Sequence, residues 1–154
     1  MLEGKHFQNA YVTRNNDQAI AEVQACSNIR KLIQTEVTVD VWTPKGQGSI
    51  STKLALIWVD DLQYEIIQPI GGDVELYVDA LQDDGRPQFH HICMRVNDWD
   101  EFRQRVDQQP FPVVLEGGSD ALKFIYLDAR ALLGHFLEYT WMTEERWIQM
   151  GGRG

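Results

Sequence analysis

Four residues of this sequence have side chains that bind divalent cations or move protons, and they occupy matching places in the two halves of the chain. Gln8 and His91 each lie early in an apolar, strand-like segment, and an offset of 83 residues superimposes one on the other. Glu65 and Glu138 each interrupt a later apolar segment of their own half. Imidazole, carboxylate and amide oxygen all bind such cations. The spacing therefore predicts two donor residues from each half.

Two carboxylates that face the same interior need a partner. At a separation of about 4 Å, Glu65 and Glu138 would repel by roughly 4 kcal/mol at an effective dielectric near 20. A shared proton or a bound cation would relieve this repulsion, and Gln8 and His91 could complete a cation site. A second interpretation stays open, in which the glutamates lie on solvated strand faces and His91 is a hydrogen-bonded histidine.

The elements that carry these residues repeat the order strand, helix and three strands. In the first half, hydrophobic periodicity predicts a strand, a helix and three further strands over residues 7–13, 18–29, 35–42, 53–59 and 63–68. In the second half, it predicts a strand at 89–96, a helix between Asp98 and Pro110, and strands at 111–115, 122–127 and 134–141. A repeat of this length exceeds the periods of solenoids and propellers, so we expect two paired modules.

The predicted fold class is α+β, with two tandem βαβββ modules that form one curled mixed sheet around a central site. The 154 residues are typical of one domain. We expect module 1 at about residues 6–70, a connector at about 71–87, module 2 at about 88–142 and a disordered tail at about 149–154.

Composition restricts the class of partner. The formal net charge of −9 argues against binding to nucleic acid or to an anionic membrane, because both need clustered Lys and Arg. We find neither a transmembrane run nor a signal-like start, so we expect a cytoplasmic protein. Cys26 and Cys93 lie in apolar surroundings, which predicts two reduced packing thiols, with a disulfide as the alternative.

Four segments, together with Asp17 and Ala19, resemble the vicinal oxygen chelate superfamily of glyoxalases, bleomycin-resistance proteins and dioxygenases. They read FQNAYV at 7–12, YEIIQP at 64–69, FHHICM at 89–94 and GHFLEY at 134–139. The pattern is closest to the glyoxalase-like and methylmalonyl-CoA epimerase-like group. In that family each module curls into a half-barrel, and the first and last strands of both modules hold one divalent metal ion.

The resemblance implies which residues bind that ion and which elements the ion could be. By position, the metal ligands would be Gln8, Glu65, His91 and Glu138. The ion would be Mn, Co, Ni, Mg or Zn. Gln8 departs from the histidine that many metal enzymes of the family carry there, and His6, two residues earlier, could substitute for it.

The resemblance also implies roles beyond the ligands. Glu138 would be the catalytic base as well as a ligand, and Asp40 a second catalytic carboxylate, although the residues alone favour a solvated position for Asp40. His90, next to His91, should point to the opposite face of its strand and be a structural or a surface residue. Arg95 could bind a substrate carboxylate or form a surface ion pair. The residues expected to bind substrate are Tyr11, Trp42, Trp58, Phe89, Arg95 and Phe136, of which the aromatics could equally be core.

Two functions from different classes are compatible with these features. The first is a metal-dependent glyoxalase-like enzyme, an isomerase, epimerase or lyase, that acts through a stabilised enolate of an oxo-acid, a hydroxy-ketone or a thioester. The second is a metal-free protein of the bleomycin-resistance type that binds and sequesters a small molecule. In both cases the partner is a small molecule, and the resemblance implies a homodimer.

Overall fold

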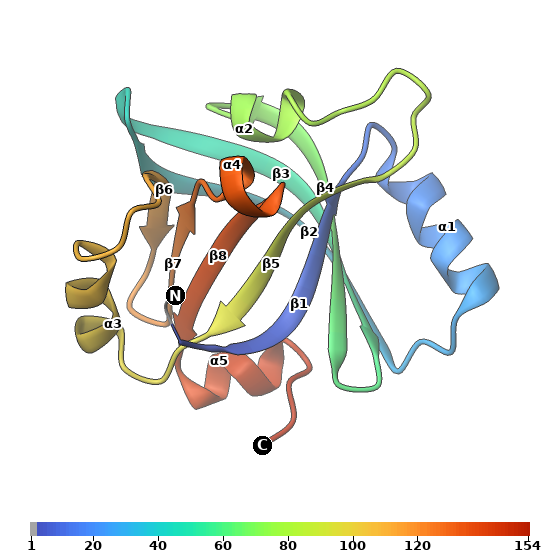
Figure 1. The fold of residues 1–154 in the computed structure, drawn as a ribbon. Coiled ribbons are helices and arrows are strands. Elements are labelled where there is room, and N and C mark those ends of the chain that lie inside the picture. Colours follow the sequence, from blue (N-terminus) through green and yellow to red (C-terminus); the bar gives the residue numbers. More distant parts are fainter. Residues whose placement is uncertain (1–2) are drawn as a thin grey trace.

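The two predicted modules meet along their first strands (Figure 1). In the computed structural model, which describes residues 3–154, β1 (Lys5–Val12) runs antiparallel to β5 (Gln88–Arg95). On its other side β1 is parallel to β4 (Leu62–Gly72), and β5 is parallel to β8 (Phe136–Met142). The four strands that carry the candidate ligands are therefore adjacent, in the order β4, β1, β5, β8.

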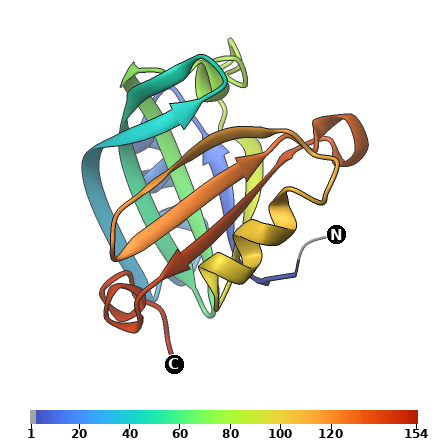
Figure 2. The ribbon, with the colours of Figure 1, turned by 90° about the vertical axis from the view of Figure 1, so that its left-hand side faces the viewer.

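The other four strands close the sheet into a barrel. β2 (Lys31–Thr43) and β3 (Gly46–Val59) form a long antiparallel hairpin, and β6 (Val113–Gly118) pairs with β7 (Leu122–Leu127). Figure 2 shows the strands of the two modules curling toward each other around a common interior. The mixed, curled sheet confirms the predicted α+β class.

Two helices cover opposite outer flanks of the barrel (Figure 1). α1 (Asn16–Cys26) begins where the Asn15 side chain accepts a hydrogen bond from the Gln18 amide at 3.0 Å. α3 (Trp99–Val106) begins where Asp98 accepts one from the Glu101 amide at 2.9 Å. The apolar stripe of α1 packs against β3 and β4, and that of α3 against β7 and β8. α1 begins and ends slightly before the predicted helix of residues 18–29.

Three short helices lie at the ends of the barrel. α2 (Glu75–Val78) and α4 (Arg130–Leu133) lie at one end, and α5 (Glu144–Gln149) lies at the other (Figure 1). α2 forms in the expected connector and buries Tyr77 in the barrel core, with residues such as Val12 and Ile67. This packing fills the α2 end of the interior.

The chain after α5 packs against the barrel. The Trp58 indole N–H donates to the Met150 carbonyl at 2.7 Å, and the Trp147 indole N–H donates to the Arg153 carbonyl at 3.0 Å. The segment from residue 149, for which we expected disorder, thus supplies the acceptors that two buried indoles need.

Turns and cysteines differ from the prediction in detail. β3 begins at Gly46, ahead of the strand predicted at 53–59, because Gly46 takes a φ of +114° and turns the chain tightly. Both cysteines are free, as predicted, but only Cys93 is buried, and Cys26 is exposed at the end of α1. Within residues 3–154, no helix is long and apolar enough to cross a membrane.

Candidate metal centre

Strand register turns four predicted residues toward the barrel interior. β1 lies between β4 and β5, so that Ala10 pairs with both Glu65 and His91. The small side chain of Ala10 leaves the space between these two residues open. Two residues earlier on the same face, Gln8 pairs with Gln63 and with Cys93. Cys93 pairs in turn with Glu138 on β8, which completes the arrangement.

Three of the predicted ligands converge on one point. Ligand atoms of Glu65, His91 and Glu138 all lie within 4.8 Å of one another. Nε2 of His91 lies 2.9 Å from Oε2 of Glu138 and 3.8 Å from Oε2 of Glu65. The imidazole is fully buried, and each carboxylate is 12% exposed. The repeat in the sequence thus places a histidine between two nearly buried carboxylates.

A chain of hydrogen bonds determines which nitrogen of His91 carries a proton. Nε2 of His90 lies 3.0 Å from the Leu76 carbonyl, which can only accept, so this nitrogen bears the hydrogen. Nδ1 of His90 must then accept from Nδ1 of His91, at 2.8 Å. Nε2 of His91 is left without a proton, and its lone pair faces the two carboxylates. That atom is buried without a hydrogen-bond partner among the described residues.

His90 is therefore not the outward residue that strand alternation predicted. It is 2% exposed, and its ring stacks on Phe136 with ring centroids 4.8 Å apart. The register between β1 and β5 shifts between Ala10 and Tyr11, opposite this part of β5, which breaks the simple alternation of side chains. In metal sites, a histidine ligand commonly donates its second N–H to such a neighbouring group, which fixes the ring.

Gln8 presents a second unpaired atom that could bind a metal ion. Its amide nitrogen donates to Oε1 of Gln63 at 2.6 Å, and its own Oε1 has no hydrogen-bond partner among the described residues. The Gln8 residue is 5% exposed and lines the same cavity as the two glutamates. A buried carbonyl oxygen without a partner costs free energy unless a ligand or cation satisfies it. The unpaired oxygen, the imidazole lone pair and the carboxylates fit a divalent cation.

Burial shifts the charges of this group. Desolvation raises the pKa of Glu138 to about 8, and desolvation together with the Glu138 charge raises the pKa of Glu65 well above its usual value. Desolvation lowers the pKa of His91 to about 3, so the imidazole is neutral at pH 7. A neutral imidazole is the form that binds metals, and a cation would favour ionisation of both carboxylates.

The centre opens into a cavity of about 190 Å³ inside the barrel. Gln8, Glu65 and Glu138 contribute its polar wall, and aliphatic residues of β2 and β3, such as Val37 and Leu54, contribute the opposite wall. The hydroxyls of Tyr77 and Tyr126 are 2.9 Å apart on the same cavity, and burial raises the pKa of both, so both stay protonated at neutral pH.

Several residues on the cavity wall were not predicted from the sequence. Tyr126 lies directly opposite Glu138 in the β7–β8 pairing, so a register argument could have found it. Tyr77 lies in the segment interpreted as a connector, and Arg146 lies beyond the last predicted strand. Cys93, interpreted only as a packing thiol, also lines the cavity next to Glu138.

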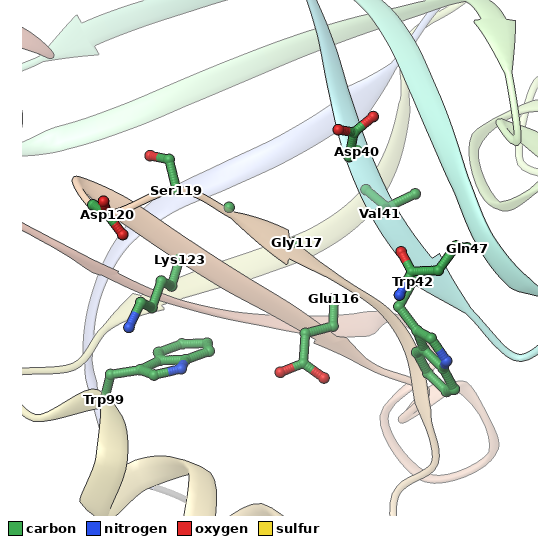
Figure 3. A pocket seen from close by; sticks show the side chains of 11 residues that line it. Asp40, Val41, Trp42, Gln47, Trp99, Glu116, Gly117, Ser119, Asp120 and Lys123 are labelled. Carbon is green, nitrogen blue, oxygen red and sulfur yellow. The ribbon is translucent and has the colours of Figure 1, made fainter.

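Asp40 does not reach the cavity. It is exposed on the outer face of β2, while Val37 and Val39 face inward. With Trp42 it lines a second pocket of about 590 Å³ on the outer surface where β2 meets β6 (Figure 3). The expectation that Asp40 is a second catalytic carboxylate of this centre is therefore not supported by its position.

None of the six residues expected to bind substrate lines the barrel cavity. Tyr11 and Phe89 pack together on the outside of β1 and β5, with ring centroids 5.6 Å apart. Trp42 is 39% exposed, and Trp58 is buried against the chain after α5. The other two have different partners: Arg95 pairs with Glu144 at 3.0 Å, and Phe136 stacks on His90.

His6 does not substitute for Gln8. The β1–β5 register shifts between the two residues, so the irregular strand turns His6 out of the interior. Its Nε2 lies 2.8 Å from Oδ1 of Asn9 on the surface. Gln8 is the residue of β1 that faces the centre.

A family profile decides the relationship of the chain to known proteins. The profile described as "Glyoxalase/Bleomycin resistance protein/Dioxygenase superfamily" matches residues 7–126. The chain belongs to this superfamily. The match includes Gln8, Glu65 and His91, whereas Glu138 lies beyond it. No curated protein matches the sequence significantly.

Several solved structures share the fold of this chain at low sequence identity. Methylmalonyl-CoA epimerase from Mycobacterium tuberculosis is 17% identical, with a TM-score of 0.65, and the alignment covers 96% of this chain and 93% of the epimerase chain. A hypothetical protein from Bacillus halodurans is 15% identical, with a TM-score of 0.67 and coverage of 92% and 96%. A methylmalonyl-CoA epimerase from Streptomyces coelicolor is 12% identical, with a TM-score of 0.62 and coverage of 94% and 97%. These likenesses show that the chain shares the fold of these proteins.

Proposed function

We propose that this chain is a metal-dependent enzyme that moves a proton at a carbon next to a carbonyl group, as an isomerase, epimerase or lyase. One observation carries the proposal: the unprotonated Nε2 of His91 faces two nearly buried carboxylates at 2.9 and 3.8 Å. Without a proton or cation, this arrangement would be repulsive. The unpaired Oε1 of Gln8 adds a fourth donor on the same cavity.

The residues that would hold the ion are Gln8, Glu65, His91 and Glu138. Three oxygen-donor residues and one imidazole suit Mn, Co, Mg or Ni better than a sulfur-rich zinc site, although Zn also accepts such ligands. A bound divalent ion would stabilise negative charge that develops on a substrate carbonyl oxygen. The acidic proton would be that of an oxo-acid, a hydroxy-ketone or a thioester.

The chain itself supplies a proton carrier and a dry surrounding. Glu138 would hold or move the proton at its carboxylate, because burial places its pKa at about 8, near the operating pH of a general base. Tyr126 and Tyr77 stay protonated, and because one hydroxyl donates to the other, the second is free to donate a hydrogen bond to a substrate oxygen. The aliphatic wall of β2 and β3 excludes water, which strengthens these interactions.

Elemental analysis of the purified protein tests the metal. We expect about one divalent ion per chain, loss of that ion in Glu138→Gln, and retention in Glu36→Gln, whose side chain is exposed on β2. Activity is tested by proton NMR in deuterated water with 2-oxobutanoate, hydroxyacetone and methylmalonyl-CoA as candidate substrates. Exchange of the α-proton by the parent protein, and loss of that exchange in Glu138→Gln, would support the enzymatic function.

A metal-free protein that binds one of these compounds without exchange would contradict the proposal and favour the sequestering function. The homodimer implied by the resemblance is a separate part of the proposal. Light scattering of the purified chain at several concentrations tests it, and a monomer throughout would contradict it.

A further inference from the structure

An arginine lies at the mouth of the barrel cavity on an anchored helix. α5 lies across the end of the barrel opposite α2 (Figure 1), and its Arg146 lines the cavity together with Met150 of the following turn. Trp147 of α5 packs edge-on against Phe7 and Trp58, with ring centroids 5.1 and 5.7 Å apart. This packing fixes the backbone at Arg146, so only side-chain rotation is needed to place the guanidinium.

Arg146 forms no ion pair with any other residue of the part of the chain that the structure describes. Its neighbour on α5 behaves differently, since Glu144 pairs with Arg95. Among the described residues that line the cavity, Arg146 is also the single basic one. An unpaired guanidinium at a cavity mouth is well suited to a carboxylate, which it can bind with two parallel hydrogen bonds.

The cavity itself limits the size and chemistry of the group that such a carboxylate can carry. Its volume of about 190 Å³ is somewhat larger than the roughly 150 Å³ cavity that admits benzene in a protein core. That space suits a ligand of about six to eight non-hydrogen atoms. The wall formed by Val37, Val39 and Leu54 is aliphatic, whereas polar donors face it from β1, β4 and β8.

We propose that the substrate class of this cavity is a short-chain oxo acid with a free carboxylate. The carboxylate binds Arg146 at the mouth, the alkyl chain packs against the β2–β3 wall, and the carbonyl oxygen faces Glu65 and Glu138. This inference rests on the proposed function for the role of the carbonyl, whereas selection of the carboxylate rests on Arg146 alone. It separates free acids from amides and from thioesters that lack a free carboxylate.

Calorimetric titration tests the proposal with matched pairs of ligands. The probes are straight-chain 2-oxo acids of about four to eight carbons and their primary amides, each titrated into protein loaded with Mn²⁺ and into protein treated with chelator. We expect the shorter acids to bind about tenfold to a hundredfold more tightly than their amides, which is typical of a charge-assisted hydrogen bond. Affinity should fall once the chain outgrows the cavity.

The Arg146→Gln variant should lose this preference for acids, and Arg146→Lys should retain part of it. Arg153→Gln, in the segment after α5 and not on the cavity wall, is the matched control and should bind like the parent. Equal binding of acid and amide by the parent, unchanged acid binding by Arg146→Gln, or no binding of any acid would overturn the inference.

The failure of this inference and the failure of the proposed function give different results. A preference for acids that persists after chelation, in a protein that binds no metal, would contradict the metal-dependent enzyme and leave the role of Arg146 standing. Metal binding with no preference for acids would contradict the role of Arg146 and leave the metal-dependent enzyme standing.

Discussion

The two modules supply equivalent pairs of donors to the centre, but they hold the first-strand donor in different ways. In module 1, Gln8 is oriented by one amide, through the hydrogen bond to Gln63 at 2.6 Å. In module 2, His91 is oriented by His90, which is itself oriented by the Leu76 carbonyl of the connector. Module 2 therefore fixes both the direction and the protonation of its donor, whereas module 1 fixes direction only.

The difference extends to the glutamates of the last strands. Glu138 of module 2 lies 2.9 Å from the free nitrogen of His91, and Glu65 of module 1 lies 3.8 Å from it. Burial is the largest cause of the raised pKa in both glutamates, so the difference between them lies in these distances. The asymmetry indicates that module 2 forms the tighter half of the centre, and substitutions in one module at a time test that difference.

The largest effect should come from neutralising one glutamate. We expect Glu138→Gln and Glu65→Gln each to weaken Mn²⁺ binding by more than about a hundredfold, which exceeds the usual effect of residues that only orient a ligand. Glu138→Gln should be the more severe because of its shorter contact with His91. Calorimetric titration of Mn²⁺ measures both, with Glu36→Gln as the exposed control. If either variant binds Mn²⁺ as tightly as the parent, the carboxylate that it lacks is not a metal ligand.

The orienting residues should have the next largest effect. His90→Phe keeps the ring that stacks on Phe136 but removes the acceptor for Nδ1 of His91, so the proton is free to move to Nε2 and block coordination. Gln63→Leu removes the partner of Gln8 without altering a protonation state. By the same titration, we expect His90→Phe to weaken metal binding by roughly 100-fold. Gln63→Leu should weaken it by only about 10-fold. A larger loss in Gln63→Leu would reverse the ranking of the modules.

Making the modules alike should have a smaller effect of the opposite sign. Gln8→His places an imidazole on each first strand, and imidazole is the stronger donor for Ni²⁺ and Zn²⁺. We expect these two ions to bind about tenfold more tightly, with little change for Mg²⁺, which prefers oxygen. Competition with a metallochromic dye measures the change, and circular dichroism checks that the buried substitution leaves the fold intact. Uniform weakening for all three ions would mean that the interior does not accommodate the ring.

Local pattern in the sequence was enough for most elements and for part of the centre. The strand predicted at 122–127 coincides with β7, because alternation and turn residues act locally. The repeat located Glu65, His91 and Glu138, since equivalent strands of a paired fold meet at one axis. The catalytic role of Asp40 came from the resemblance alone, whereas its alternation with Val37 and Val39 already favoured the solvated face on which it lies.

Other features depend on tertiary geometry that no local pattern contains. The register shift that turns His6 outward depends on how β1 pairs with β5. The contact between His90 and His91 depends on where α2 places the Leu76 carbonyl. Arg146 reaches the cavity only because α5 folds back across the end of the barrel, after the last strand that the periodicity could predict.

The smallest effect is a dependence of stability on pH in metal-free protein. Glu138 has a folded-state pKa of about 8 and a usual value of 4.5, and the pKa of Glu65 is raised as well. Their protonated forms therefore favour the folded state. That stability is fully present below pH 4.5 and is lost as pH rises through about 8. The lowered pKa of His90 and of His91 acts only below the usual value of 6.5, toward about 3, so it does not affect this window.

Thermal unfolding between about pH 7 and pH 9 should thus show a melting temperature that falls by a few degrees, since about 1 kcal/mol corresponds to about 2–4 °C at this chain length. Glu138→Gln and Glu65→Gln should each flatten the dependence, because each variant removes one titrating carboxylate and the charge that it places beside the other. Glu36→Gln should keep the parent slope. Saturating Mn²⁺ should reverse the trend, because deprotonated carboxylates bind the ion more tightly as pH rises. A parent slope in either glutamate variant would show that this carboxylate does not titrate in the window, and that the asymmetry of the modules includes the protonation of their glutamates.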